Sequence, residues 1–225
     1  MSPFLTMVFL AGVSGTPLPP RADAGSDPVI VAALAGVTFP NVAASLQVRT
    51  LSAGTVVRKL DHKVWANGKK LHVRDGTRPL DVYVDVGKKV LVVHDEGQPQ
   101  AVRFKLAEPA GQRIAGQLLG ALVLPPGLTK TGSEKVLGKD CDVYEGEGPS
   151  LLAGSAARAK QKRWVWKGMV LRARSEEGPQ VIETEITSLE LGRAKAKDLD
   201  VPRGTKVKDA EELTLPPPPD VGPKQ

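Results

Sequence analysis

The chain has 225 residues, one cysteine and a formal net charge of +6. Once the ends are set aside, this length fits one domain with a substantial apolar core. A single thiol excludes an internal disulfide, and the alternation of Cys141 with Val143 in KDCDVYE predicts a buried small hydrophobe instead of a reactive thiol. The positive charge directs attention to anionic partners, either nucleic acid or lipid headgroups.

The N-terminus has the pattern of an export signal. Residues 4–13 form an apolar stretch that is too short to span a bilayer as a helix. Small residues follow, and Ala22-Asp23-Ala24 has the A-x-A form of a cleavage site. We therefore expect residues 1–24 to be a signal peptide and the mature protein to be soluble in the periplasm. No cysteine stands at the signal junction, so a lipid anchor is not expected.

Residues 25–41 are expected to be a linker and a short helix. Pro, Gly and Ala are frequent from residue 16 to residue 28, and apolar residues are dense from 29 to 36, where the helix is predicted.

Short amphipathic strands follow from residue 42 to residue 191. In LDVYVDV, Leu80, Val82 and Val84 share one face of a strand, and in VRFKL Phe104 does the same. Turn signals such as Asn67-Gly68 separate the strands and predict antiparallel neighbours. The expected strands are 42–51, 55–65, 71–74, 80–86, 90–95, 102–106, 135–137, 140–145, 161–167, 169–175 and 181–191.

One helix is predicted inside this strand region, over residues 112–123. Ile114, Leu118 and Leu122 recur at four-residue spacing, Pro109 precedes them, and Pro125-Pro126 ends the pattern. A single helix between two groups of strands is expected to lie across the apolar face of the sheet. The fold class is therefore mainly β with few helices, that is, α+β.

A basic stretch, RAKQKRWVWK, spans residues 158–167 and surrounds two tryptophans. Such a stretch can bind nucleic acid, but an exported protein rarely meets any, so no nucleic-acid partner is expected. An anionic membrane surface is the favoured contact, and a solvated strand face is the alternative. The candidate contacts are Lys160, Lys162, Arg163 and Lys167.

Catalytic and metal-binding patterns are absent from the sequence. GSEKVLGKD has the wrong spacing for a phosphate loop, and no G-x-S-x-G motif occurs. The three histidines, His62, His72 and His94, stand singly in strands and are expected to be structural. We therefore expect no enzyme activity, no cofactor and no metal site.

Several segments, in order, resemble the LolA-like superfamily of periplasmic lipoprotein carriers. They cover residues 42–209, and the strength of the resemblance lies in their order and spacing. VAASLQVRTL resembles the first strand of the family, and VWANGKKLHV resembles a segment in which a Trp, here Trp65, precedes a basic turn. The others are DVGKKVLVV, SEKVLGKDCDVYE, WVWKGMVLRAR and the closing LDVPRGTKVKD.

The resemblance implies a LolA-like half-barrel domain over residues 42–209. In it, a strongly curved antiparallel sheet, an incomplete β-barrel, has helices covering its concave face and encloses an apolar cavity for acyl chains. Ordinary core packing is the alternative for each tryptophan. The candidate cavity residues are Leu46, Trp65, Leu71, Val73, Val82, Val84, Phe104, Leu118, Leu122, Trp164, Trp166 and Leu171.

Two functions are open from the sequence. The first is a soluble periplasmic protein, expected to be a monomer, that binds a lipid or an acylated lipoprotein and serves outer-membrane lipoprotein or lipid trafficking. The second is a non-carrying envelope scaffold that docks a protein partner through its basic strand face. The remaining residues, 210–225, are proline-rich and are expected to form an extended, disordered tail.

Overall fold

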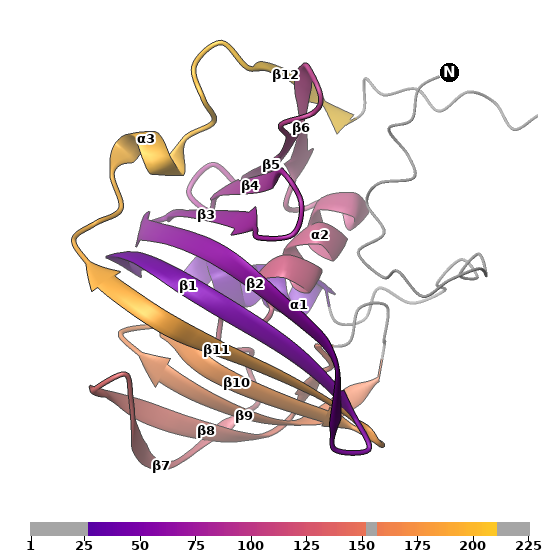
Figure 1. Ribbon diagram of the computed structural model, residues 1–225, viewed down its shortest axis with the longest axis vertical. Helices are drawn as coiled ribbons and strands as arrows, with labels where there is room; N and C mark the ends of the chain where they lie inside the picture. Colours follow the sequence, from indigo (N-terminus) through magenta and orange to yellow (C-terminus); the bar gives the residue numbers. More distant parts are fainter. Residues whose placement is uncertain (1–26, 152–156, 211–225) are drawn as a thin grey trace, which may run out of the picture.

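The computed structural model describes residues 27–151 and 157–210. Its centre is one twelve-stranded sheet, whose strands lie in the order β12-β6-β5-β4-β3-β2-β1-β11-β10-β9-β8-β7. All neighbours in it are antiparallel except β12 and β6, which are parallel. The sheet is strongly curved and does not close, since β12 and β7 form its two edges (Figure 1). The predicted incomplete barrel, mainly β with few helices, is confirmed.

The chain builds the sheet as two meanders that meet at β1 and β11. The first consists of β1 (Phe39–Ser52), β2 (Thr55–Gly68), β3 (Lys70–Asp75), β4 (Leu80–Asp85), β5 (Val90–Asp95) and β6 (Gln100–Lys105). The second consists of β7 (Thr129–Val136), β8 (Lys139–Pro149), β9 (Arg158–Trp166), β10 (Met169–Glu177) and β11 (Gln180–Leu191). The last strand, β12 (Lys206–Asp209), returns to β6.

Two helices lie on one face of the sheet and a third lies on the other. Helix α1 (Asp27–Gly36) precedes β1, and α2 (Pro109–Leu119) joins the two meanders; both lie on the concave side and contact each other (Figure 1). The short α3 (Ala196–Leu199) lies on the outer side of β2 and β3. Within the described ranges, no helix is long and apolar enough to cross a membrane.

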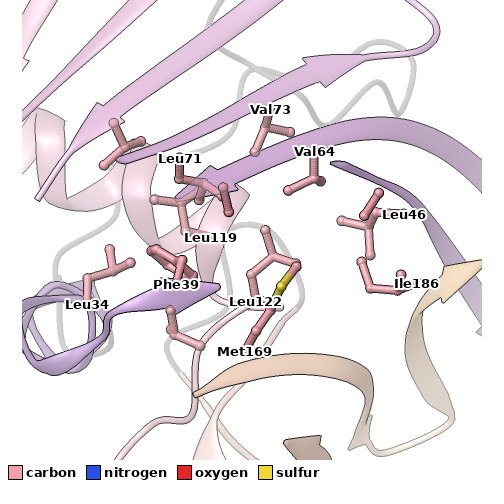
Figure 2. Packing of buried hydrophobic residues seen from close by; sticks show 14 of the residues in the cluster. Leu34, Phe39, Leu46, Val64, Leu71, Val73, Leu119, Leu122, Met169 and Ile186 are labelled. Atoms are coloured by element: carbon pink, nitrogen blue, oxygen red, sulfur yellow. The ribbon is translucent and has the colours of Figure 1, made fainter. Parts of the chain in front are cut away.

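Strand alternation forms the core on the concave side. Along β1, Val42, Ala44 and Leu46 are buried, and they pair with the buried residues Ala66 and Val64 of β2 and Ile186 of β11. The pattern continues across β3 and β4 and meets the helices (Figure 2). The burial of these apolar side chains is the main contribution to the free energy of folding, at about 25 cal/mol per Å² of apolar surface removed from water.

Two turns differ from simple expectation. The hairpin predicted at Asn67-Gly68 is shifted by one residue, because Asn67 pairs with Lys70 and Gly68 takes the first turn position with φ 60°. The turn between β7 and β8 places Leu137, a residue with a Cβ, at φ 51° before Gly138. A left-handed conformation of this kind costs about 1–2 kcal/mol for a non-glycine residue.

Candidate functional site

The apolar cluster on the concave face contains most of the predicted cavity residues. Those buried in it are Leu46, Leu71, Val73, Val82, Val84, Leu122 and Leu171. Trp164 is buried as well, but on the face of β9 opposite Arg163: its Nε1 donates to Glu134 at 2.7 Å and Lys162 lies over its ring, so it does not line the concave face. Phe104, Leu118 and Trp166 are partly buried and pack against it. Whether these side chains bind an acyl chain stays a prediction.

The two concave helices cover this cluster with residues that the sequence did not single out. Leu34 of α1 and Leu119 of α2 are fully buried, and Figure 2 shows both among the buried leucines and Phe39. Leu122 follows α2 and lies beside Met169 of β10 (Figure 2), and its carbonyl accepts a hydrogen bond from the Val170 amide. We call α1 and α2 the lid.

Helix α2 begins at Pro109, three residues before the predicted start, and ends at Leu119, four residues before the predicted end. Pro109 stands in the first turn, where its missing N–H costs nothing. Gly111 lies so close to the preceding strand that a Cβ there would be 2.1 Å from the carbonyl oxygen of Lys105, so only glycine fits. This contact fixes the start of the lid helix at the end of β6.

Trp65 does not line the cavity, and that expectation is wrong. Its neighbours in β2, Val64 and Ala66, are the buried inward residues, so Trp65 points to the outer face. There its ring stacks on His72 with centroids 4.7 Å apart, and His72 stacks on Tyr83 at 4.2 Å.

The outer face beneath α3 holds a buried polar cluster around this stack. His72 Nε2 lies 2.7 Å from Asp81 Oδ1, and His72 Nδ1 lies 2.7 Å from the carbonyl oxygen of Asp198. Arg74 donates to both oxygens of Asp81, at 2.8 and 2.9 Å. Burial by itself raises the pKa of Asp81, but the hydrogen bonds from His72 and Arg74 outweigh it and lower the pKa to about 2.

Arg163 was predicted to contact an anionic surface, and this is wrong because its side chain is fully buried. It lies on the face of β9 opposite Lys162, and Nη1 donates to the carbonyl oxygen of Gly120 at 2.7 Å, at the end of α2. Nε and Nη2 donate to Oε1 of Gln161. Burial lowers the pKa of Arg163 to about 9, so the group remains charged at neutral pH.

Buried polar residues surround Arg163 on the inner face of the second meander. Register places Ala173 and Thr184 in line with Arg163, and Ser175 opposite Gln161. Gln161, Ser175 and Thr184 are all less than 5% exposed. This cluster was not predicted from the sequence. The alternation of residues along β9, β10 and β11 places Gln161, Arg163, Ser175 and Thr184 on one face and could have indicated it.

The remaining basic candidates lie outside the core. Lys162 is paired with Glu134 at 3.2 Å and Glu145 at 3.0 Å, so this part of the strand face is neutralised. These three residues also border a shallow groove of about 310 Å³ beside β7. Lys160 and Lys167 are exposed.

Apolar and basic side chains meet at one end of the sheet, where the β7–β8 and β9–β10 turns lie. Leu137 is 45% exposed at the tip of the first turn. The ammonium groups of Lys139 and Lys167 lie 5.7 and 5.2 Å from the ring centroid of Trp166, within the range of cation–π attraction. We call Leu137, Lys139, Trp166 and Lys167 the turn end.

The described residues contain no group of three or more His, Cys, Asp or Glu side chains able to hold a metal ion. Cys141 is buried, as predicted, and burial raises the pKa of its thiol.

No family model matches the sequence, and no curated protein matches it. Solved structures of similar chains include PNGF-II, at 12% identity and a TM-score of 0.42; the match covers 76% of this chain and 32% of PNGF-II, so this chain spans about a third of that protein. A second is the lipoprotein LppX of Mycobacterium tuberculosis, at 18% identity and a TM-score of 0.35, with 76% of this chain and 100% of that chain covered.

A third is the LolA superfamily protein NE2245 from Nitrosomonas europaea, at 12% identity and a TM-score of 0.38, with 78% of this chain and 98% of that chain covered. At these identities and TM-scores the similarity assigns neither a family nor a function to this chain. NE2245, one of these similar structures, is described as a LolA superfamily protein, and the strand segments of this chain resemble that superfamily in sequence.

Proposed function

We propose that the protein binds a lipid acyl chain, free or attached to a lipoprotein, between the concave face of its sheet and the lid. The observation that carries the proposal is the continuous apolar cluster shared by the unclosed sheet and the two lid helices. Residues 37–38, 106–108 and 120–128 join α1 and α2 to the strands and belong to no strand, so the lid can move without breaking a sheet ladder. An acyl chain can then replace the side chains of the lid against the same apolar surface.

The energetics suit such an exchange. A dozen buried methylenes contribute about 10 kcal/mol at ~0.8 kcal/mol each. Part of this offsets the cost of association and of displacing the lid, and micromolar binding requires about 8 kcal/mol. The proposed role is lipid or lipoprotein trafficking in the periplasm, with the export signal of residues 1–24 as its motivation. That segment and residues 211–225 of the predicted tail, 210–225, lie outside the described residues.

A fluorescent long-chain acyl probe tests the proposal. The wild-type protein should bind it with a micromolar Kd. Leu118→Asp places a carboxylate at the partly buried contact between α2 and the cluster and should abolish probe binding, because a charge that loses water there without a partner is unfavourable. Leu118→Gln is the milder variant if the first does not fold.

Arg113→Asp is the matched control, since Arg113 is exposed on the same helix, and it should bind like wild type. A folded wild-type protein that binds no probe and carries no co-purified lipid would contradict the proposal and favour the scaffold function.

The basic strand face gives little support to that second function. Lys162 is held between two glutamates and Arg163 is buried, so neither presents a free charge to a partner. We propose instead that contact with an anionic membrane occurs at the turn end. There an exposed leucine, a tryptophan and two lysines combine the apolar and basic groups that such a surface binds.

A further inference from the structure

Arg163 is a buried cation without an anionic partner in residues 27–151 and 157–210. Its side chain is fully buried, and its hydrogen bonds go to the amide oxygen of Gln161 and the carbonyl oxygen of Gly120, both of which are neutral. A guanidinium has five N–H donors, and these bonds use three of them. The structure thus holds an uncompensated positive charge with spare donors next to the apolar cluster.

Such an arrangement is costly. Removing a charge from water costs several kcal/mol, even after relaxation, unless a counter-ion and hydrogen bonds repay it. The carbonyl of Gly120 at the end of α2 carries only the partial negative charge of a helix terminus. A leucine or methionine at position 163 would avoid the penalty, so packing alone does not explain an arginine here.

The surroundings of Arg163 are suited to an anionic group. Ser175 and Thr184 place buried hydroxyl-bearing side chains on the same inner face, one in the row of Gln161 and one in the row of Arg163. Next along β11, Ile182 and Ile186 are buried apolar residues on that face. A patch of buried polar side chains therefore adjoins the apolar cluster of the proposed acyl site.

We propose that Arg163 binds the carboxylate of a fatty acid whose chain lies in the apolar cluster. The inference rests on the proposed function and names its ligand class, an acyl chain that ends in a carboxylate. The planar fork of a guanidinium matches a carboxylate in a bidentate pair. In this structure the carbonyl oxygen of Gly120 occupies one acceptor position, so ligand binding moves the C-terminal turn of α2 and exchanges a neutral acceptor for a charged one.

Displacement of a neutral fluorescent acyl probe by palmitic acid and by hexadecan-1-ol measures the contribution of the carboxylate. Wild-type protein should bind the acid at least about tenfold more tightly than the alcohol, the ratio expected for a hydrogen-bonded charged group. Arg163→Gln should reduce the ratio to about one while leaving the alcohol affinity within about twofold. Arg172→Gln, an arginine paired with Glu185 on the other face, is the matched control and should keep the wild-type ratio.

Gln161→Glu provides a second test of the anion site if Arg163→Gln does not fold. The new carboxylate would sit where the Gln161 amide oxygen already meets the guanidinium, so it should raise Tm and remove the preference for the acid by competing for Arg163. A purely structural role for Arg163 predicts the rise in Tm without any change in the acid-to-alcohol ratio, and that result would overturn the proposal.

Equal affinity of wild-type protein for acid and alcohol would leave the acyl site standing and refute the anion site. Binding of neither compound would refute both.

Discussion

Replacing Asp81 with asparagine should destabilise the protein by an amount that depends strongly on pH. Asp81 is 1% exposed and accepts hydrogen bonds from His72 and Arg74. The other ring nitrogen of His72 lies 2.7 Å from the carbonyl oxygen of Asp198, so the histidine connects Asp81 to α3. The substituted amide would leave the Arg74 and His72 donors facing a neutral, poorer acceptor.

The shift in the pKa of Asp81 sets the magnitude. Lowering it from 3.8 to about 2 corresponds to about 2 kcal/mol of folding free energy, at 1.36 kcal/mol per pKa unit. Because the folded-state pKa is the lower one, this contribution is complete above the unfolded-state value of 3.8 and is lost as the pH falls toward 2. Asp81→Asn should therefore cost about 2–4 kcal/mol at pH 7 and clearly less near pH 2.5.

Urea unfolding followed by far-UV circular dichroism at the two pH values measures these free energies. Asp209→Asn serves as the control, because Asp209 forms a half-exposed pair with Arg103 and should cost less than about 1 kcal/mol. A loss for Asp81→Asn that is equal at both pH values would refute the assignment of the stabilisation to the ionised carboxylate.

Three further predictions concern other parts of the chain. Cys141 should resist alkylation in the folded protein and react after denaturation, and Cys141→Ala should cost about 1 kcal/mol with acyl binding unchanged; rapid native labelling would contradict its burial. At the turn end, Leu137→Ser and the pair Lys139→Gln with Lys167→Gln should each weaken co-sedimentation with anionic vesicles several-fold and leave neutral vesicles unaffected; equal binding by all variants would place the contact elsewhere. Mass spectrometry of periplasmic protein should find a mature N-terminus at or before Gly25, and an intact Met1 would argue against export.

Strand periodicity predicted the inner wall of the sheet well where the residues alternate clearly in polarity. Leu71 and Val73 of β3, and Val82 and Val84 of β4, follow that alternation and are all buried on the concave face. Only one face of such a strand can be apolar, so burial follows directly from composition.

Trp65 and Arg163 were assigned to faces of the sheet that disagree with their positions in the strands. Trp65 was assigned to the cavity as part of the family resemblance, although its neighbours Val64 and Ala66 already supply the inward row. Arg163 was assigned outward because it is charged, yet alternation with the paired Lys162 places it inside. The hydropathy of a residue type reflects the average cost of burying it. It does not reveal a specific hydrogen-bond acceptor such as the Gly120 carbonyl at the end of α2, which Arg163 contacts.

Some features depend on contacts that no local pattern carries. The return of β12 to β6 was not predicted, because a four-residue strand with two lysines has too little periodicity. The same holds for α3, whose contacts with β2 and β3 follow from the path of the chain.

The meeting of the two meanders has a consequence for how the protein folds. Strand β1 pairs on one edge with β2, the next strand in the chain. On its other edge it pairs with β11, where Val42 lies opposite Leu191, a residue far away in the sequence. Pairings this distant in the chain carry a large loop-closure cost and slow folding. Until β11 arrives, one edge of β1 exposes unpaired backbone groups, which other chains can use as a template. The pairing of β1 with β11 therefore completes the sheet late in folding. Aggregation competes most directly with folding before this pairing forms, so a chaperone that covers the free edge of β1 would reduce aggregation.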